Sequence, residues 1–149
     1  MGLGKALELA TEHMESNNKK LVYLRDKLIN GLLEIPHTRL NGPRGENRLP
    51  GNSNVCFRFI EGESILLMLD AMGIAASSGS ACTSGALDPS HVLLSIGLPH
   101  EIAHGSLRLS LGDASTEEEV DYVLDAVPKI IQRLRDMSPL WDDYLKEAK

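Results

Sequence analysis

Apolar residues recur at helical spacing in two long stretches, one at each end of the chain. The first runs from about Leu3 to Leu33, and the second begins at Ser115 and Thr116. Intervals of three and four residues place such side chains on one face of an α-helix. Three glutamates after Thr116 suit a helix N-terminus, and Pro128 predicts a kink. The apolar faces consist of Leu7, Ala10, Met14, Leu21, Leu24, Leu28 and Leu32 in the first helix, and of Val120, Val123, Leu124, Val127, Ile130, Ile131 and Leu134 in the last.

The middle of the chain predicts shorter elements separated by glycine and proline. A helix is expected to stop at Gly73, and Asp88-Pro89 predicts the N-cap and first turn of another that ends near Gly97. Because no regular crossover helices join the strands, we expect an α+β domain, residues 1–149, with a small, mostly antiparallel sheet and helices packed on one side. The expected middle elements are strands near Thr38 to Leu40, Asn54 to Ile60, Ile74 to Ala76 and Ser106 to Leu111, a helix over Glu63 to Met72, and a short turn beginning at Pro99.

Composition places the chain among ordinary globular proteins. Of its 149 residues, 42% are hydrophobic and 24% are charged. The formal net charge of −6 argues against nucleic acid as the main partner, because phosphate binding needs a surplus of Lys and Arg. No apolar run approaches the length of a membrane span, and no charged and apolar leader opens the sequence. A cytoplasmic location, without membrane attachment, is the expectation.

A stretch of small residues surrounds one of the two cysteines. Residues 77–85 contain only serine, glycine, alanine and threonine apart from Cys82. Such a loop allows a large substrate to approach the sulfur, and its hydroxyl and amide groups can support a thiolate nucleophile. A tight turn around an inert, half-buried thiol is the alternative. Cys56 lies in an alternating segment typical of a strand and is expected to be structural, although a Cys56–Cys82 disulfide remains open.

Arg108 lies in the clearest strand of the sequence. In Ser106 to Leu111 the leucines alternate with Ser106, Arg108 and Ser110, so that the arginine is flanked by two small residues on its face. This leaves room for a ligand, and the guanidinium fork suits bidentate binding of a carboxylate. A salt bridge from Arg108 to a neighbouring helix is the other interpretation.

His100, Glu101 and His104 match the H-E-x-x-H pattern of zinc hydrolases. In that pattern two histidines one helical turn apart bind zinc and the glutamate is the general base. Pro99 and Gly105 leave little room for a helix, and no later histidine could complete the site. A surface turn with locally bonded histidines is the alternative, and a zinc hydrolase remains a remote one.

Several motifs together resemble the C-terminal part of cysteine desulfurases of the NifS and IscS type, in the class-V aminotransferase-like family. The resemblance covers essentially the whole chain, and the cysteine loop together with the arginine strand is its most specific part. The motifs that carry it are the residues from Ser77 to Ser84, Leu87 to Ser90 and Ala103 to Gly112, with Glu61 to Ser64, Thr116 to Glu119 and Ser138 to Trp141 around them.

The resemblance implies a role for each part of the chain. Members of this family use pyridoxal phosphate to convert L-cysteine to L-alanine, and a loop cysteine accepts the sulfur as a persulfide for iron–sulfur cluster assembly. By this resemblance Cys82 is the sulfur-accepting nucleophile and Arg108 binds the substrate carboxylate. His104 matches a family position beside that strand, and we expect it to be structural. The fold implied is the small domain of fold-type I pyridoxal-phosphate enzymes.

The chain departs from the family in one respect. The Schiff-base lysine motif belongs to a preceding large domain, and no such motif occurs here. We therefore expect a C-terminal domain that is catalytically incomplete alone and binds no cofactor covalently. Expected partners are that large domain, an iron–sulfur scaffold or other acceptor protein, and a second subunit in a complete homodimer. A stand-alone sulfur-carrier or scaffold-docking module is the alternative. The lysines are Lys5, Lys19, Lys20, Lys27, Lys129, Lys146 and Lys149.

Overall fold

Three short antiparallel strands form the centre of the fold. The computed structural model describes residues 2–78 and 89–147 of the chain. The strands are ordered β1-β2-β3, and the predicted α+β class with a small antiparallel sheet is confirmed. The elements are α1 (Gly2–Leu33), β1 (Thr38–Leu40), the 3-10 turn η1 (Gly45–Asn47), β2 (Asn52–Phe57), α2 (Gly62–Asp70), α3 (His91–Ser95), α4 (His100–His104), β3 (Ser106–Ser110), α5 (Glu117–Asp136) and α6 (Pro139–Glu147).

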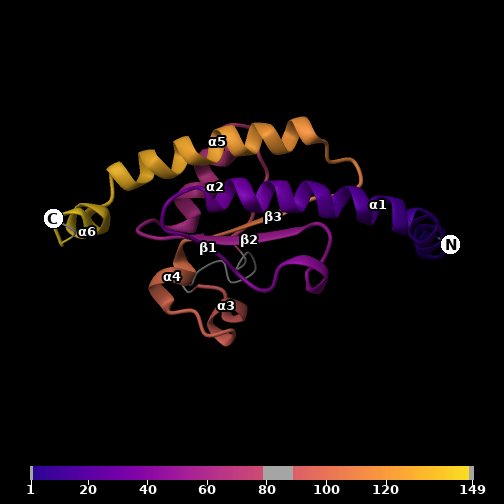
Figure 1. The fold of residues 1–149 in the computed structure, drawn as a ribbon, viewed down its shortest axis with the longest axis horizontal. Coiled ribbons are helices and arrows are strands. Elements are labelled where there is room, and N and C mark those ends of the chain that lie inside the picture. Colours follow the sequence, from indigo (N-terminus) through magenta and orange to yellow (C-terminus); the bar gives the residue numbers. More distant parts are fainter. Residues whose placement is uncertain (1, 79–88, 148–149) are drawn as a thin grey trace.

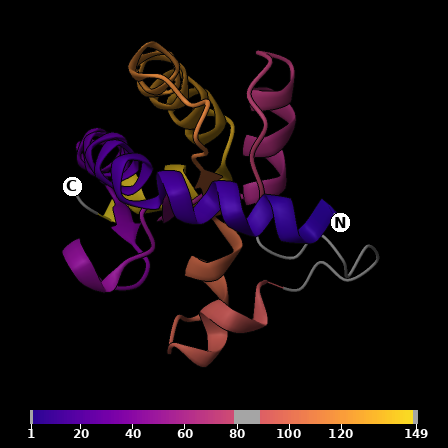
Figure 2. The same cartoon turned by 90° about the vertical axis from the view of Figure 1, so that its right-hand side faces the viewer.

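Helices lie against both faces of this sheet (Figures 1 and 2). The long helices α1 and α5, together with α2, cover one face and enclose the main hydrophobic core. The short helices α3 and α4 lie on the other face, where Leu93, Leu98 and Ala103 pack around Cys56. The prediction of helices on one side therefore describes the main core, and a second, smaller layer covers part of the opposite face.

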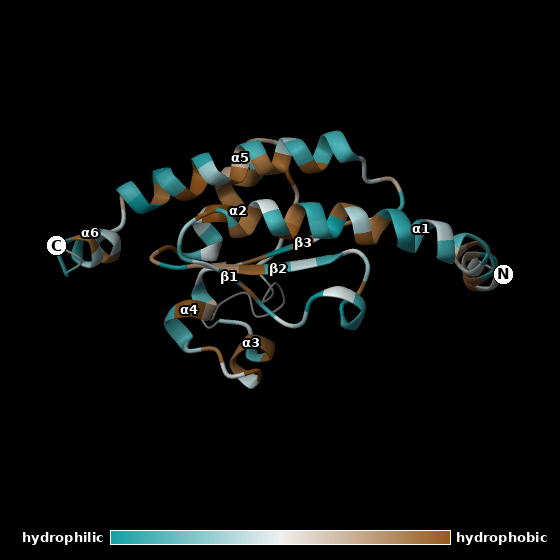
Figure 3. Cartoon of the chain, in the orientation of Figure 1, coloured by the Kyte–Doolittle hydropathy of each residue, from teal (hydrophilic) through white to brown (hydrophobic). Residues whose placement is uncertain are grey.

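Helix α5 begins where the sequence predicts the last long helix to begin. The Thr116 side chain accepts a hydrogen bond from the Glu119 backbone, and the Glu119 side chain accepts one from the Thr116 backbone, which makes a capping box. Helix α5 continues through Pro128, and its apolar positions face α1 (Figure 3). Lys27 of α1 donates to Glu117 at 2.7 Å and contacts Asp121 at 2.6 Å, so an ion-pair group ties the two long helices together.

Two predicted boundaries are wrong. Residues Ile74 to Ala76 form no strand; only Ser77 makes an isolated bridge to Arg108 on β3. Gly73 adopts a positive φ of 75° and the Ile74 amide bonds back to the Leu69 carbonyl of α2, so this amide is not available to the sheet and the chain pairs with β3 only at Ser77. Strand β2 was expected from Asn54 to Ile60. It begins two residues earlier, at Asn52, and ends three residues earlier, at Phe57.

The start of α3 is a third correction. Pro89 was expected in its first turn, but the helix begins at His91 with Ser90 at the N-cap position. Pro89 thus precedes the helix, and Asp88, the expected N-cap, lies outside the described residues. No helix among the described residues is long and apolar enough to cross a membrane.

Aromatic rings of the C-terminal helix α6 pack against His37 and Phe59, next to the ends of β1 and β2. His37, at a positive φ of 58°, lies with its ring centroid 4.9 Å from Tyr144 and 5.5 Å from both Phe59 and Trp141. Burial, helped by the nearby Arg135 and Arg58, lowers the pKa of His37. This cluster therefore holds a histidine that favours the neutral state.

Candidate functional site

Arg108 occupies the middle of β3, and the sheet holds its backbone on both edges. On one edge it lies opposite Asn54 of β2. On the other edge it exchanges two backbone hydrogen bonds with Ser77, of 3.0 and 2.6 Å. Its neighbours Leu107 and Leu109 are buried in the main core, so the alternation of the strand directs Arg108 to the opposite face, away from the long helices. The predicted facing of this strand is confirmed.

The Arg108 side chain lines a cavity of about 380 Å³ with both polar and apolar walls. Its walls come from three parts of the chain that are distant in sequence. These are the 41–52 loop with strand β2, the segment at Ser78, and the start of α3 at Ser90. The cavity therefore presents amide and hydroxyl groups beside two arginines, Arg108 and Arg48, together with apolar side chains of α3. A small anionic ligand would find charged donors there together with neutral ones.

No carboxylate of the described residues lies within ion-pair distance of the Arg108 guanidinium. The alternative interpretation, a strand arginine neutralised by a neighbouring helix, thus has no support in this part of the chain. The side chain is exposed rather than desolvated. Its fork of donors remains available to a ligand at the cavity.

An amide pair stands beside Arg108 on the same face of the sheet. Directly opposed residues of antiparallel strands have Cβ atoms about 5 Å apart, which makes Asn54 the nearest cross-strand neighbour of Arg108. The Nδ2 group of buried Asn41 donates to Asn54 Oδ1 at 2.6 Å and to Cys56 Sγ at 3.1 Å. The Oδ1 atom of Asn41 is buried without a partner in the described structure. These amides line the cavity and were not anticipated from the sequence.

A second arginine shapes the cavity wall. Arg48 is buried and donates to the carbonyls of Pro43 at 2.6 Å and Asn52 at 3.3 Å, and also to the carbonyl of Asn41. Burial lowers the pKa of its guanidinium, with nearby Arg25 as a further cause. Because its donors are bonded to backbone oxygens, Arg48 acts as a clamp on the 41–52 loop.

The predicted nucleophile, Cys82, lies outside the described residues. The segment that leads to it is held next to Arg108. Beyond the Ser77 bridge, the Ser78 carbonyl accepts a hydrogen bond of 2.8 Å from the hydroxyl of Ser106 on β3. The anchored residue Ser78 also lines the cavity.

Cys56 is a structural thiol, as predicted. It is fully buried and free, and burial raises the pKa of its thiol. A raised pKa keeps the group protonated and unreactive near neutrality. Because Cys56 is a free thiol, it does not form the disulfide with Cys82 that the sequence left open.

The H-E-x-x-H residues form helix α4, of only five residues. The rings of His100 and His104 lie 6.1 Å apart between centroids. Among the described residues there is no group of three or more His, Cys, Asp or Glu side chains placed to hold a metal ion. The sequence match therefore gains no third ligand from this part of the fold.

The described lysines are engaged elsewhere. Five of them bond to carboxylates, and Lys20 donates to the carbonyl of Asp113. None of the six lines the Arg108 cavity. A cofactor aldehyde near Arg108 would therefore find no amine among the described lysines.

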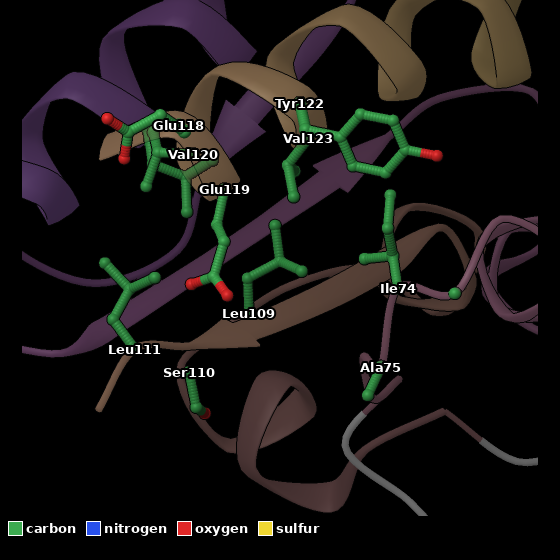
Figure 4. A pocket seen from close by; sticks show the side chains of 12 residues that line it. Ile74, Ala75, Leu109, Ser110, Leu111, Glu118, Glu119, Val120, Tyr122 and Val123 are labelled. Atoms are coloured by element: carbon green, nitrogen blue, oxygen red, sulfur yellow. The ribbon is translucent and has the colours of Figure 1, made fainter. Parts of the chain in front are cut away.

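A second cavity, of about 520 Å³, lies on the other side of β3 (Figure 4). Leu109, Leu111 and Ile74 line it, with Tyr122 and Val123 of α5 above them. Its lining is mainly apolar and contains none of the predicted site residues. We therefore place the candidate site at Arg108 rather than in this larger groove.

Comparison with known proteins identifies the family. A sequence model described as "Aminotransferase class-V" matches residues 1–123. The chain belongs to the class-V aminotransferase family. The relatives of this class-V chain include "Cysteine desulfurase IscS" of Clostridium botulinum, 62% identical over 100% of this chain and 38% of the relative. The protein of the same name from Methanosarcina thermophila is 61% identical, over 94% of this chain and 34% of the relative.

A solved structure agrees with the sequence matches. The "NIFS-LIKE PROTEIN" superimposes with a TM-score of 0.75 and 33% identity, covering 87% of this class-V chain and 32% of that structure. The chain thus spans well under half the length of the relatives and structures that it matches.

The sequence singled out Arg108 but not its surroundings. Asn54 and Cys56 alternate along one strand, which hints that they share a face. The approach of Asn41 and Ser90 to that face depends on a loop and a helix that no periodicity specifies. Only the folded chain brings these groups to Arg108.

Proposed function

We propose that the chain is the C-terminal, small-domain part of a cysteine desulfurase of the IscS and NifS type. In this proposal residues 1–149 form one domain, Cys82 accepts sulfur, and Arg108 binds the carboxylate of L-cysteine. The names of the relatives and the family match support the activity. The roles of the two residues rest on the site itself.

The observation that carries the proposal is the position of Arg108 beside the start of the cysteine loop. Arg108 lines a cavity and has no carboxylate partner among the described residues, and Ser77 and Ser78 are bonded to its strand. Cys82 follows Ser78 by four residues, so the chain itself limits their Cα separation to about 14 Å. A substrate whose carboxylate lies on Arg108 is thus within reach of the thiol.

The proposed reaction needs one thiol of the enzyme for each sulfur atom that it removes from the substrate. L-cysteine and the Cys82 thiol give L-alanine and a Cys82 persulfide: the C–S bond of the substrate breaks, and an S–S bond to Cys82 forms. The thiolate is the reactive form of such a nucleophile. Transfer of the outer sulfur to an acceptor, such as an iron–sulfur scaffold, would regenerate the thiol.

Cysteine desulfurases of this family depend on pyridoxal phosphate, which supplies an electron sink. The described lysines do not fit the group, because they are bonded elsewhere and none lines the Arg108 cavity. We therefore propose that residues outside this chain hold the cofactor, in the larger part of the enzyme, and that the complete enzyme is a homodimer.

The test uses a chimaeric enzyme in which this chain replaces the matching 38% of the Clostridium botulinum desulfurase. We expect the chimaera to form alanine from L-cysteine and to release sulfide when a thiol reductant is added to reduce the persulfide. Without that reductant it should carry one extra sulfur atom, located by mass spectrometry on Cys82. Cys82→Ser should abolish all three, whereas Cys56→Ser, the matched control, should retain them. An active Cys82→Ser enzyme would refute the assigned nucleophile.

A sulfur-carrier module is the second candidate, and the bonded lysines favour it for the chain acting alone. It predicts that the 149-residue chain gains a sulfur atom on Cys82 from a persulfide donor without any cofactor. If the chimaera were inactive while the chain alone took up sulfur, this second function would replace the first.

A further inference from the structure

A row of polar side chains crosses the sheet from the end of β1 to β3. The backbone amide of Asn41 donates to the Asn54 carbonyl at 2.9 Å, and Asn54 of β2 lies opposite Arg108 of β3. Directly opposed residues of antiparallel strands have their side chains on the same face of the sheet. The three side chains therefore share one face, and all three line the 380 Å³ cavity.

The register brings Asn54 and Arg108 close together. The Phe57 amide donates to the Gly105 carbonyl at 2.8 Å, which makes these two residues a hydrogen-bonded pair. Because the two kinds of pair alternate along β2, Asn54 and Arg108, three positions away, form a non-hydrogen-bonded pair. The backbone of Arg108 accordingly bonds to Ser77 on its other edge. Cα atoms of a non-hydrogen-bonded pair are only about 4.5 Å apart, so the Asn54 amide lies beside the stem of the arginine.

The Asn54 amide is held in one orientation. Its Oδ1 atom accepts the 2.6 Å hydrogen bond from Asn41 Nδ2, so the oxygen of the amide faces β1. The Nδ2 group is the other branch of this planar amide and carries two N–H donors. It makes no hydrogen bond to any described residue. The part of the amide that remains available to a ligand is therefore a donor.

Asn41 holds this orientation at a cost to stability. It is only 5% exposed, and its Nδ2 group donates to Asn54 Oδ1 and to Cys56 Sγ. Its own Oδ1 atom is buried without a partner among the described residues. Burial of an unpartnered oxygen is unfavourable, because the hydrogen bond to water is lost and not replaced. Folding alone therefore does not favour asparagine at this position, whereas the orientation of Asn54 requires its donor.

We propose that Asn54 is a second binding residue for the substrate carboxylate, beside Arg108, and that Asn41 is the residue that positions it. The inference rests on the proposed function, which supplies the carboxylate. In this arrangement the fork of Arg108 donates to the two carboxylate oxygens, and the Nδ2 group of Asn54 donates to one of them. The two oxygens together have about four lone-pair sites, so they can accept all three bonds.

A neutral amide in this place preserves the charge of Arg108. An aspartate opposite the arginine would pair with it and repel an anionic ligand. An asparagine adds a donor without neutralising the guanidinium. The pair therefore favours a ligand that carries a carboxylate over an amine that lacks one.

Binding calorimetry on the chimaera tests the role of Asn54. L-alanine, the product of the proposed reaction, carries the carboxylate, and ethylamine is the same molecule without it. Asn54→Ala should raise the Kd of L-alanine about tenfold, the loss expected for one hydrogen bond to a charged group, and leave the Kd of ethylamine unchanged. Asn30→Ala is the matched control, because Asn30 is an exposed asparagine of α1 that does not line the cavity. It should change neither constant.

The ratio of the two constants separates binding from folding, because both ligands are measured on the same preparation. Equal losses for L-alanine and ethylamine would overturn the role of Asn54, since the substitution would then act through the fold. An unchanged Kd for L-alanine would overturn it as well. Asn54→Asp should weaken L-alanine more than Asn54→Ala does, because the new carboxylate would pair with Arg108. Equal effects of the two substitutions would contradict the closeness of the pair.

A double-mutant cycle tests the positioning role of Asn41. Asn41→Ala should raise the Kd of L-alanine about threefold while Asn54 is present and have almost no effect in the Asn54→Ala background. A positioning residue acts only through the group that it orients. Independent losses that multiply in the double variant would remove this role of Asn41.

The failure of this inference and the failure of the proposed function give different results. A chimaera that forms no alanine from L-cysteine could still lose affinity for L-alanine, and not for ethylamine, with Asn54→Ala. That result would remove the function and leave the carboxylate site. An active chimaera whose kcat/KM for L-cysteine is unaffected by Asn54→Ala would remove the role of Asn54 and leave the function.

Discussion

Replacing Arg108 by glutamine separates ligand binding from folding. The arginine is exposed, lines the 380 Å³ cavity and has no carboxylate partner among the described residues. Its backbone bonds to Ser77 and its pairing with Asn54 do not depend on the side chain. Arg108→Gln should therefore remove the charged fork while strand β3 stays in place.

The magnitude follows from the bonds that a carboxylate would lose. A hydrogen bond to a charged group contributes about 1.5 to 3 kcal/mol, and an open cavity argues for the lower end. Two such bonds amount to about 3 kcal/mol, which lowers kcat/KM for L-cysteine roughly 100-fold. The free energy of unfolding should change by less than about 0.5 kcal/mol, as for surface substitutions that break no contact.

Sulfide release by the chimaera and urea denaturation of the 149-residue chain measure the two effects. Arg39→Gln is the matched control, because Arg39 is an exposed strand arginine on β1 that does not line the cavity. It should leave both quantities unchanged. A drop in kcat/KM below about threefold for Arg108→Gln, or an unfolding free energy lowered by more than about 1 kcal/mol, would refute the reasoning.

Three further predictions concern stability. Gly105→Ala should lower the free energy of unfolding by about 3 kcal/mol or more in urea denaturation, because a Cβ there would lie 2.0 Å from the Phe57 carbonyl oxygen. Gly112→Ala, with nothing within 4 Å, should be nearly neutral, and equal effects would contradict the packing. Thr116→Ala should cost about 1 kcal/mol, or roughly 3 °C in melting temperature, through the lost cap, whereas Thr116→Ser should not. Burial lowers the pKa of His37 from its ordinary value of 6.5, so the unfolded chain binds a proton at a higher pH than the folded chain does. The stability that the neutral His37 contributes is therefore present above pH 6.5 and is lost as the pH falls toward the folded pKa. His37→Asn, which tolerates the positive φ, should flatten this pH dependence in thermal melts, and an unchanged slope would count against it.

The regular elements followed from local signals. The periodicity of the long stretches predicted α1 and α5, and the residues at Thr116 predicted the cap, because both depend on neighbours along one helix. The Ile74 to Ala76 strand was wrong because its pairing depends on a distant edge. Ile74 and Ala75 instead line the 520 Å³ cavity together with Leu109 of β3, and the chain pairs with the strand only at Ser77.

The candidate site was anticipated as single residues rather than as an arrangement. Alternation along one strand was enough to direct Arg108 away from its leucine neighbours. The amide pair of Asn41 and Asn54 could not be anticipated, because it joins the end of β1 to the middle of β2. Strand register and loop conformation decide such contacts, and neither has a periodic signature.

The sequence by itself determined the helical faces, the α+β class, the facing of Arg108 and the small-residue surroundings of Cys82. These features depend on residue size, polarity and spacing over a few positions. The tertiary structure alone decided that Arg108 has no carboxylate partner among the described residues, that Cys56 is buried and inert, and that the first half of α1 is uncovered. Each of these depends on which distant surfaces meet, because burial and pairing are properties of the packed chain.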